Sequence, residues 1–189
     1  MSSLEQMYQQ VILDHAKSPH GRGLVEAADA TTHGQSHQVN PTCGDEVTLR
    51  VEIGGAGGAA GSGPAQHTIS RVSWEGQGCS ISQASLSVLT DLVTGRPVDE
   101  AEHLGEVFRE LMGSRGKGLD DDAEDELGDA TAFTGVSRYP ARIKCALLGW
   151  AALRDSLVTS GALDGTGTTN VTEPAGAAPS APGTTEENR

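Results

Sequence analysis

The sequence predicts a mixed fold of helices and strands, with one N-terminal helix, two neighbouring strands and then a run of helices. Two patterns support this prediction. Polar and apolar residues alternate in segments 46–53 and 68–75, which is typical of strands with one buried face. Elsewhere apolar residues recur every three or four positions, the spacing of a helix face. With 189 residues the chain is long enough for one domain with its own core and short for two.

The first helix is predicted to begin after Ser2, because Glu5 stands three positions later and the two can form a capping box. Pro19 and Gly21 are expected to end it. Its apolar residues follow helical spacing: Leu4, Met7, Tyr8, Val11 and Ile12.

The two alternating segments are predicted to pair as strands. In the first, Val47, Leu49 and Val51 share one face with Ile53. The glycine-rich segment 54–64 between the strands is expected to be a flexible loop, too long for a tight hairpin. It lacks the Gly-Lys-Ser/Thr ending of a phosphate-binding P-loop, so we do not expect nucleotide binding there.

Two helices are predicted to follow the strands. The first has an apolar face over 81–92 and a stop signal at Gly95. The second is expected to start at Asp99, with Glu102 completing a capping box.

The last helix is predicted from Pro140, a favoured first-turn residue, to about residue 157. The preceding stretch, 113–129, is rich first in glycine and then in acidic residues. Its seven carboxylates allow a calcium site as an alternative, but the alternation and central glycine of an EF-hand loop are missing, which favours a solvated charged surface. We predict a folded domain over 1–160 and a disordered tail over 161–189, where apolar residues are too few to form a core.

The composition excludes several classes of function. A net charge of −13 would repel nucleic acid and anionic membranes, and favours partners with basic patches. No stretch approaches the roughly 18 apolar residues of a membrane helix, and the N-terminus lacks the pattern of a signal peptide. Three cysteines make a poor disulfide framework, so we expect reduced thiols in the cytoplasm.

The three cysteines occupy informative positions. Cys43 lies on a loop before a strand, Cys79 at a strand-to-helix junction, and Cys145 in the opening turns of the last helix. Helix N-termini favour thiolate over thiol, which suggests reactive or metal-binding sulfur at the last two. With Asp45, the three thiols form an acceptable donor set for tetrahedral zinc. Their spacing, 79 − 43 = 36 and 145 − 79 = 66 residues, is not diagnostic.

Three interpretations of these residues therefore stay open from residue chemistry alone. They are a metal site, a lone reactive thiol, and cysteines that are small buried apolar residues. His33 and His37 stand four apart, but four residues of a strand span roughly 13 Å, too far to share one ion. We expect each histidine to be a surface or hydrogen-bonded residue.

Three motifs, "NPTCGD" at 40–45, "GQGCSISQAS" at 76–85 and "ARIKCALLGW" at 141–150, resemble in this order the SufU branch of the U-type iron–sulfur assembly proteins, which are related to IscU. The resemblance spans roughly residues 4–157. It implies an α+β fold, a small three-stranded antiparallel sheet packed on one side by about five helices. The third strand would lie around 31–39, where propensity alone does not reveal it.

The resemblance also implies a function. The metal ligands would be Cys43, Asp45, Cys79 and Cys145, holding Zn²⁺. The chain would be a sulfurtransferase that takes persulfide sulfur onto Cys43 from a pyridoxal-phosphate cysteine desulfurase of the SufS type and passes it to downstream iron–sulfur assembly proteins. The alternative is a scaffold that assembles a [2Fe–2S] cluster, or holds iron, on the same four residues.

Two departures from the IscU branch matter. Lys144 stands where that branch has a histidine before the last cysteine, which favours the zinc interpretation. "RYPARIKC" replaces the chaperone-binding motif of that branch, which argues against handover to its dedicated chaperone. Arg142 and Lys144 stand just before Cys145, where they could attract a persulfide or an acidic partner surface; the alternative is an ordinary solvated basic helix turn. The sequence gives no oligomeric state.

Overall fold

The computed structural model describes residues 2–28, 31–55 and 67–164. The chain runs through helix α1 (Ser3–Lys17), strands β1 (Thr32–Asn40), β2 (Asp45–Gly55) and β3 (His67–Gln77), and then helices α2 (Ser80–Val93), α3 (Val98–Gly113) and α4 (Asp121–Leu127). The 3₁₀ segment η2 (Gly128–Arg138) and helix α5 (Pro140–Thr159) complete it. No helix among these residues is long and apolar enough to span a bilayer.

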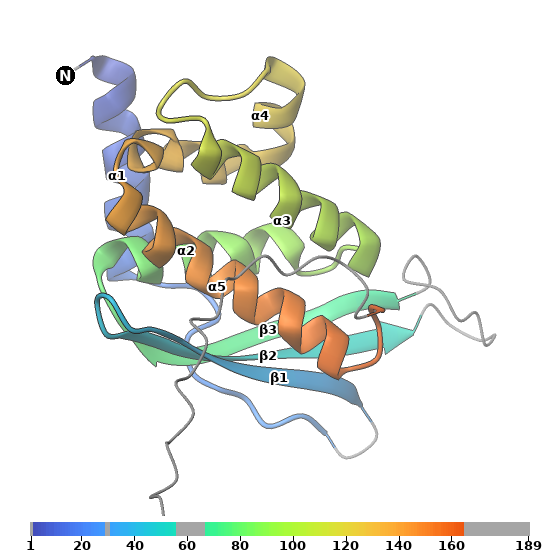
Figure 1. Ribbon diagram of the computed structural model, residues 1–189. Coiled ribbons are helices and arrows are strands. Elements are labelled where there is room, and N and C mark those ends of the chain that lie inside the picture. The colour runs from blue at the N-terminus through green and yellow to red at the C-terminus, as the bar shows by residue number, and fades with distance from the viewer. Residues whose placement is uncertain (1, 29–30, 56–66, 165–189) are drawn as a thin grey trace, which may run out of the picture.

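The three strands form one antiparallel sheet in the order β1-β2-β3, and the helices gather on one face of it (Figure 1). The alternation predicted for 46–53 is confirmed: Val47, Leu49 and Val51 are fully buried, and Trp74 of β3 pairs with Leu49. The register shifts once between β2 and β3, at Glu52/Ile53. The α+β fold implied by the sequence motifs is therefore confirmed.

The packing of strand β1 explains why its sequence does not have the propensity of a strand. Its helix-facing positions are small residues, Gly34 and Ser36, because α5 packs very close to the strand. A Cβ on Gly34 would collide with the backbone carbonyl of Ser156 in α5. Ser36 donates a hydrogen bond to Asp155 of the same helix, at 2.6 Å. Close approach of a helix backbone thus selects residues that do not favour strands.

The helix starts are partly as predicted. The Ser2–Glu5 capping box is present, with the Glu5 amide donating to Ser2 Oγ and the Ser2 amide to the Glu5 carboxylate. The start predicted at Asp99 is wrong: α3 begins at Val98, with Pro97 as an N-cap that makes no side-chain hydrogen bond. Pro97 is held instead by a β-bridge to Thr68, so the sheet fixes the start of α3 and no capping box is needed.

The acidic stretch before the last helix contains structure that the sequence analysis did not predict. Asp120 caps α4 by accepting a hydrogen bond from the Ala123 amide at 3.0 Å. Leu127 and Phe133 are fully buried and anchor α4 and η2 to the core. The acidic side chains of α4 are mostly exposed, as expected of a solvated charged surface.

The limits of the predicted loop and tail also differ in detail. Gly54 and Gly55 belong to β2 and pair with β3, while the remainder of the 54–64 loop lies outside the described residues. Ala162 and Leu163 pack against the core, so the folded chain continues past residue 160. The tail from 165 onward lies outside the described residues.

Candidate metal centre

Three segments far apart in the sequence meet at one end of the sheet. The turn between β1 and β2 carries Cys43 and leads into Asp45, the first residue of β2. Cys79 is the N-cap of α2, directly after β3. Cys145 lies in the second turn of α5. We call these four residues the thiol cluster.

Three members of the thiol cluster come together closely. The ligand atoms of Cys43, Asp45 and Cys145 all lie within 4.8 Å of one another, and the two sulfur atoms of Cys43 and Cys145 are 3.3 Å apart. Cys145 and Asp45 are buried, whereas Cys43 is exposed. Of these three residues, Cys145 and Asp45 are therefore buried and Cys43 presents its thiol to solvent.

Asp45 has the features of a ligand carboxylate. It is only 4% exposed, and its Oδ1 accepts a hydrogen bond from the Cys79 amide at 3.2 Å. Its Oδ2 is buried without a hydrogen-bond partner. Burial opposes ionisation, but interactions with the Cys145 thiol and the Cys79 amide outweigh it, so the pKa of Asp45 lies below its ordinary value. The carboxylate is thus ionised, one of its oxygens lies within 4.8 Å of the Cys43 and Cys145 sulfurs, and Oδ2 has no hydrogen-bond partner.

The environment of Cys145 corrects one expectation. Burial raises the pKa of the Cys145 thiol strongly, and the nearby Asp45 carboxylate and Cys43 thiol raise it further. The helix N-terminus does not lower it, because Cys145 is the sixth residue of α5 and the dipole acts mainly within the first turn. The protein alone therefore keeps this thiol protonated at neutral pH, and a bound cation would be needed to make it a thiolate.

Cys79 is not one of the three residues within 4.8 Å of one another, and its side chain is exposed. Its backbone nevertheless contacts the cluster through the hydrogen bond to Asp45. Gly78 allows this approach, since a Cβ there would stand 2.9 Å from Asp45 Cγ and would also collide with Ser82 Oγ. The absence of a side chain at Gly78 thus lets the start of α2 close over the carboxylate.

Asn40 is a residue of the site to which the sequence analysis gave no role. It is buried, and its Nδ2 donates toward Cys145 Sγ at 3.8 Å. Its Oδ1 accepts from the Thr42 amide, and its carbonyl accepts from the Gly44 amide. Asn40 therefore holds the turn that carries Cys43 and links it to α5. The Asn40-Pro41 pair, which only Thr42 separates from Cys43, was the available signal.

The other predicted residues lie at or away from the rim. Arg142 is exposed and its guanidinium lies over the Tyr139 ring, 4.8 Å from the centroid; Lys144 is also exposed. His33 bonds to the Thr31 carbonyl and His37 to Thr48, so the two do not share a site, in agreement with the expectation.

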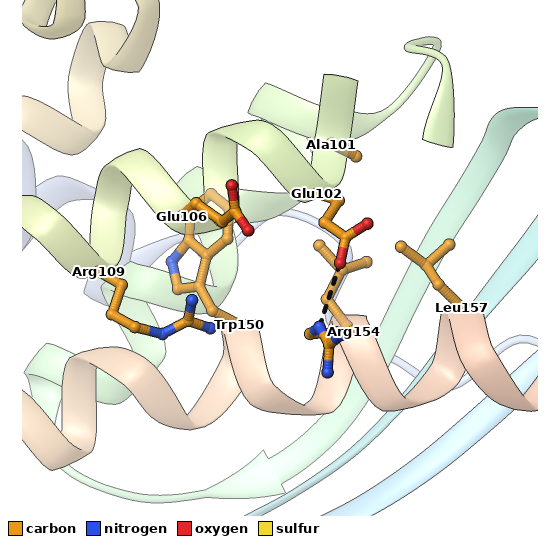
Figure 2. A pocket seen from close by; sticks show the side chains of 9 residues that line it. Ala101, Glu102, Glu106, Arg109, Trp150, Arg154 and Leu157 are labelled. Carbon is orange, nitrogen blue, oxygen red and sulfur yellow. Dashed lines mark hydrogen bonds and ion pairs between the residues drawn. The ribbon is translucent and has the colours of Figure 1, made fainter. Parts of the chain in front are cut away.

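A separate hollow lies between α3 and α5 and contains none of the predicted site residues (Figure 2). It is lined by Trp150 and by an ion pair of Arg154 with Glu102 at 3.2 Å. Its volume of about 20 Å³ has room for about one water molecule. The thiol cluster, rather than this hollow, is the place where chemistry can occur.

Comparison with known proteins places the chain in a family. Residues 7–146 match the family model described as the NifU-like N terminal domain. The chain is 36% identical to the zinc-dependent sulfurtransferase SufU of Bacillus subtilis, over 80% of this chain and 90% of that protein. It is 34% identical to the iron–sulfur cluster assembly scaffold protein IscU of Streptococcus pyogenes, over 85% and 88%.

A solved structure agrees with these matches. SufU from Fervidobacterium islandicum superimposes with a TM-score of 0.58 at 32% identity, over 82% of this chain and 99% of that one. The chain therefore belongs to the NifU-like N-terminal domain family, together with proteins named IscU and SufU.

Proposed function

We propose that this chain is a zinc-bound sulfur acceptor of iron–sulfur cluster assembly. It takes the terminal sulfur of a persulfide from a pyridoxal-phosphate cysteine desulfurase onto Cys43 and passes it on to downstream assembly proteins. The observation that carries this proposal is the exposed Cys43 thiol on a turn, 3.3 Å from the buried Cys145 thiol and close to the buried Asp45 carboxylate.

The residues of the thiol cluster fit a zinc ion. Asp45 Oδ2 is buried and without a partner, which leaves an ionised oxygen available as a ligand. Cys43, Cys79 and Cys145 supply the soft sulfur donors, and three thiolates with one carboxylate match the four-coordinate preference of zinc. When bound, zinc would keep these thiols deprotonated at neutral pH and tie their three segments together. A relative 36% identical to this chain is named a zinc-dependent sulfurtransferase.

Exposure distinguishes the roles of the thiols. Cys145 is 5% exposed in α5 and Asp45 is 4% exposed in β2, so a donor protein cannot reach them directly. Cys43 is exposed on a turn and can meet an incoming persulfide. Cys79 is exposed too, but it stands at the N-cap of α2 with its amide bound to Asp45. Cys43 is therefore the acceptor that the site favours.

The transfer step follows from thiolate chemistry. The Cys43 thiolate attacks the terminal sulfur of the donor persulfide, a new S–S bond forms on Cys43, and the donor S–S bond breaks. The donor cysteine leaves as a thiolate, so no oxidant or reductant is consumed. The chain's net charge of −13 suits a donor with a basic docking surface.

A second candidate function is a scaffold for a [2Fe–2S] cluster, because a relative 34% identical to this chain is named a scaffold protein. Elemental analysis and an absorption spectrum of protein purified without oxygen separate the two. At least one zinc per chain, without iron and without visible absorption, supports sulfur transfer. Iron with acid-labile sulfide and a brown colour supports the scaffold and contradicts our proposal.

A variant tests the role of the acceptor thiol. Cys43→Ala should fold and abolish sulfur acceptance from the desulfurase, because the exposed thiol is removed while the buried residues stay. If the variant stimulates cysteine turnover by the desulfurase as well as the unmodified chain does, the protein is an adaptor and Cys43 is not the acceptor.

A further inference from the structure

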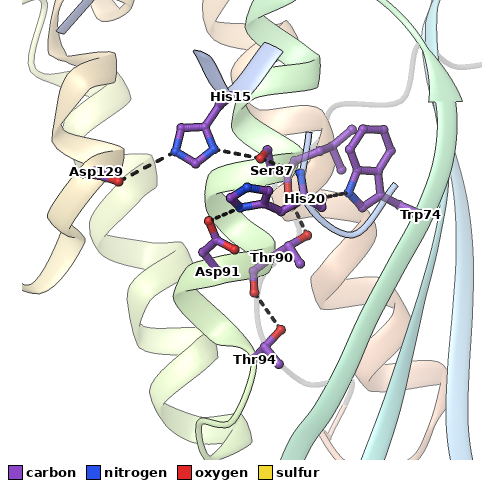
Figure 3. A network of polar contacts seen from close by, with 9 residues as sticks. His15, His20, Trp74, Ser87, Thr90, Asp91, Thr94 and Asp129 are labelled. Carbon is purple, nitrogen blue, oxygen red and sulfur yellow. Dashed lines mark hydrogen bonds and ion pairs between the residues drawn. The ribbon is translucent and has the colours of Figure 1, made fainter. Parts of the chain in front are cut away.

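Figure 3 shows a second group of side chains that could hold a metal ion, none of which belongs to the thiol cluster. His15 near the end of α1, His20 in the segment that follows, and Asp91 of α2 place one ligand atom each within 4.8 Å of one another. Asp129 of η2 approaches from the other side, with its Oδ2 3.7 Å from His15 Nε2. We call these four residues the histidine cluster.

The two clusters are separate sites. Asp91 follows Cys79 by twelve residues, so along α2 the carboxylate lies roughly 18 Å from the N-cap cysteine. None of the four residues belongs to the thiol cluster, and none has a part in the sulfur transfer proposed above.

The histidine cluster is built on anchored backbone. Trp74 Nε1 donates to the His20 carbonyl at 2.9 Å, and the His20 amide donates to Ser87 Oγ at 2.8 Å. The same hydroxyl lies 2.7 Å from His15 Nδ1, so one serine of α2 positions both histidines. The two rings meet edge to face, with centroids 5.4 Å apart. These bonds fix the backbone of His20 and the ring of His15 beside α2.

The protonation pattern suits metal binding. Ser87 Oγ already accepts from the His20 amide and has a second lone pair that can accept from His15 Nδ1–H. His15 then carries its free lone pair on Nε2, and an outer partner on the other nitrogen is the usual arrangement for a ligating histidine. His20 Nδ1 lies 2.6 Å from Asp91 Oδ2, where a metal ion can replace the shared proton.

We infer that the histidine cluster binds a divalent transition-metal ion of the zinc class through His15, His20 and Asp91, with Asp129 as a further carboxylate. The two imidazole nitrogens favour such an ion over calcium or magnesium, which take oxygen ligands. Bonds of about 2.0–2.2 Å require ligand atoms roughly 3–4 Å apart. The His20 and Asp91 side chains are exposed, so packing leaves them free to rotate toward this spacing. A bound ion ties α1 to α2.

Another histidine–carboxylate pair provides a matched control. His103 Nε2 lies 2.9 Å from Glu126 Oε2, and their side chains are 56% and 50% exposed. The values for His20 and Asp91 are 57% and 49%. The control pair is therefore equally accessible. Among the described residues, however, no third ligand joins it to form a possible metal site. If His20→Ala weakens metal binding and His103→Ala does not, the difference is due to the second imidazole and not to exposure.

The test titrates the full-length chain, without an affinity tag and already loaded with one equivalent of zinc, with Co²⁺. Equilibrium dialysis counts the ions, and NMR follows the histidine ring protons. We expect one further Co²⁺ per chain and selective broadening of the His15 and His20 signals. His20→Ala and Asp91→Asn should each weaken this binding about tenfold or more. His103→Ala should leave it unchanged.

The fold should survive the main variant, because His20 holds Trp74 and Ser87 through backbone atoms that alanine retains. Equal binding by His20→Ala and the unmodified chain would overturn the inference. So would an equal loss in His103→Ala, or broadening spread evenly over all histidines. Because the ring signals report an ion at the histidine cluster directly, Co²⁺ held only by the thiol cluster would not broaden them selectively.

Discussion

Asp45→Asn removes one negative charge from the thiol cluster and changes little else. The amide oxygen of asparagine can keep the hydrogen bond that Asp45 Oδ1 accepts from the Cys79 amide at 3.2 Å. The position of Oδ2, now buried and without a partner, is taken by an uncharged group that binds metal poorly. The substitution therefore tests Asp45 as a ligand while the link between β2 and α2 is preserved.

The size of the effect follows from the number of ligands. Structural zinc sites contribute on the order of 10 kcal/mol, and four ligands sharing this equally contribute about 2.5 kcal/mol each. At 1.4 kcal/mol for each factor of ten, the loss of one ligand should weaken zinc binding by roughly 60-fold. The metal-free protein should lose no more than about 1 kcal/mol of its unfolding free energy, because the main hydrogen bond survives.

The assay is zinc competition against a chromophoric chelator at neutral pH, together with denaturant unfolding of the metal-free protein. Glu52→Gln is the matched control, because Glu52 is a buried carboxylate on the same strand that pairs with Arg71 at 3.4 Å. It should leave zinc affinity unchanged. Zinc affinity of Asp45→Asn within threefold of the unmodified chain, or an equal loss in Glu52→Gln, would refute the reasoning.

Three further predictions concern the same site. Gly78→Ala should weaken zinc binding and lower the free energy of unfolding by about 1–3 kcal/mol, since its Cβ would stand 2.9 Å from Asp45 Cγ. Gly135→Ala is the control, because the space around Gly135 is open. It should change neither quantity in the same chelator and denaturant assays. Hydrogen peroxide should convert the metal-free protein to a Cys43–Cys145 disulfide, because the two sulfurs are 3.3 Å apart. The thiols lose two protons and two electrons, and the peroxide is reduced to water. Peptide mass spectrometry that finds no such disulfide would contradict this. Because the pKa of Cys145 is raised, its thiol is protonated at neutral pH in the metal-free protein. Zinc binding should therefore release this proton and become stronger as pH rises. Calorimetry in buffers of different ionisation enthalpy measures the proton release, and a zinc affinity independent of pH would count against the prediction.

Much of the fold could be predicted from local patterns. The alternation of Val47, Leu49 and Val51 and the Ser2–Glu5 capping box are short-range signals, and both appear in the structure as expected. Strand β1 could not be found this way, because close packing of α5 requires small residues at Gly34 and Ser36, and these do not have high strand propensity. The start of α3 was misplaced for a similar reason, since a bridge to β3 sets it.

The candidate site was predictable in its members but not in its arrangement. Motif resemblance named Cys43, Asp45, Cys79 and Cys145, and the structure brings three of them within 4.8 Å of one another. The burial of Cys145, which raises its pKa against the expected helix effect, depends on tertiary packing. The histidine cluster joins α1 to α2 over more than seventy residues, a distance at which no spacing rule in the sequence could have indicated it.

The most direct test of the proposed sulfur transfer is to identify the thiol that receives the sulfur. The chain is incubated with a pyridoxal-phosphate cysteine desulfurase and ³⁴S-labelled cysteine, alkylated, digested and mapped by mass spectrometry. We predict that the label is found as a persulfide on the peptide carrying Cys43, the exposed thiol of the β1–β2 turn. Label carried first by Cys79 or Cys145 would contradict the assignment of Cys43 as the acceptor.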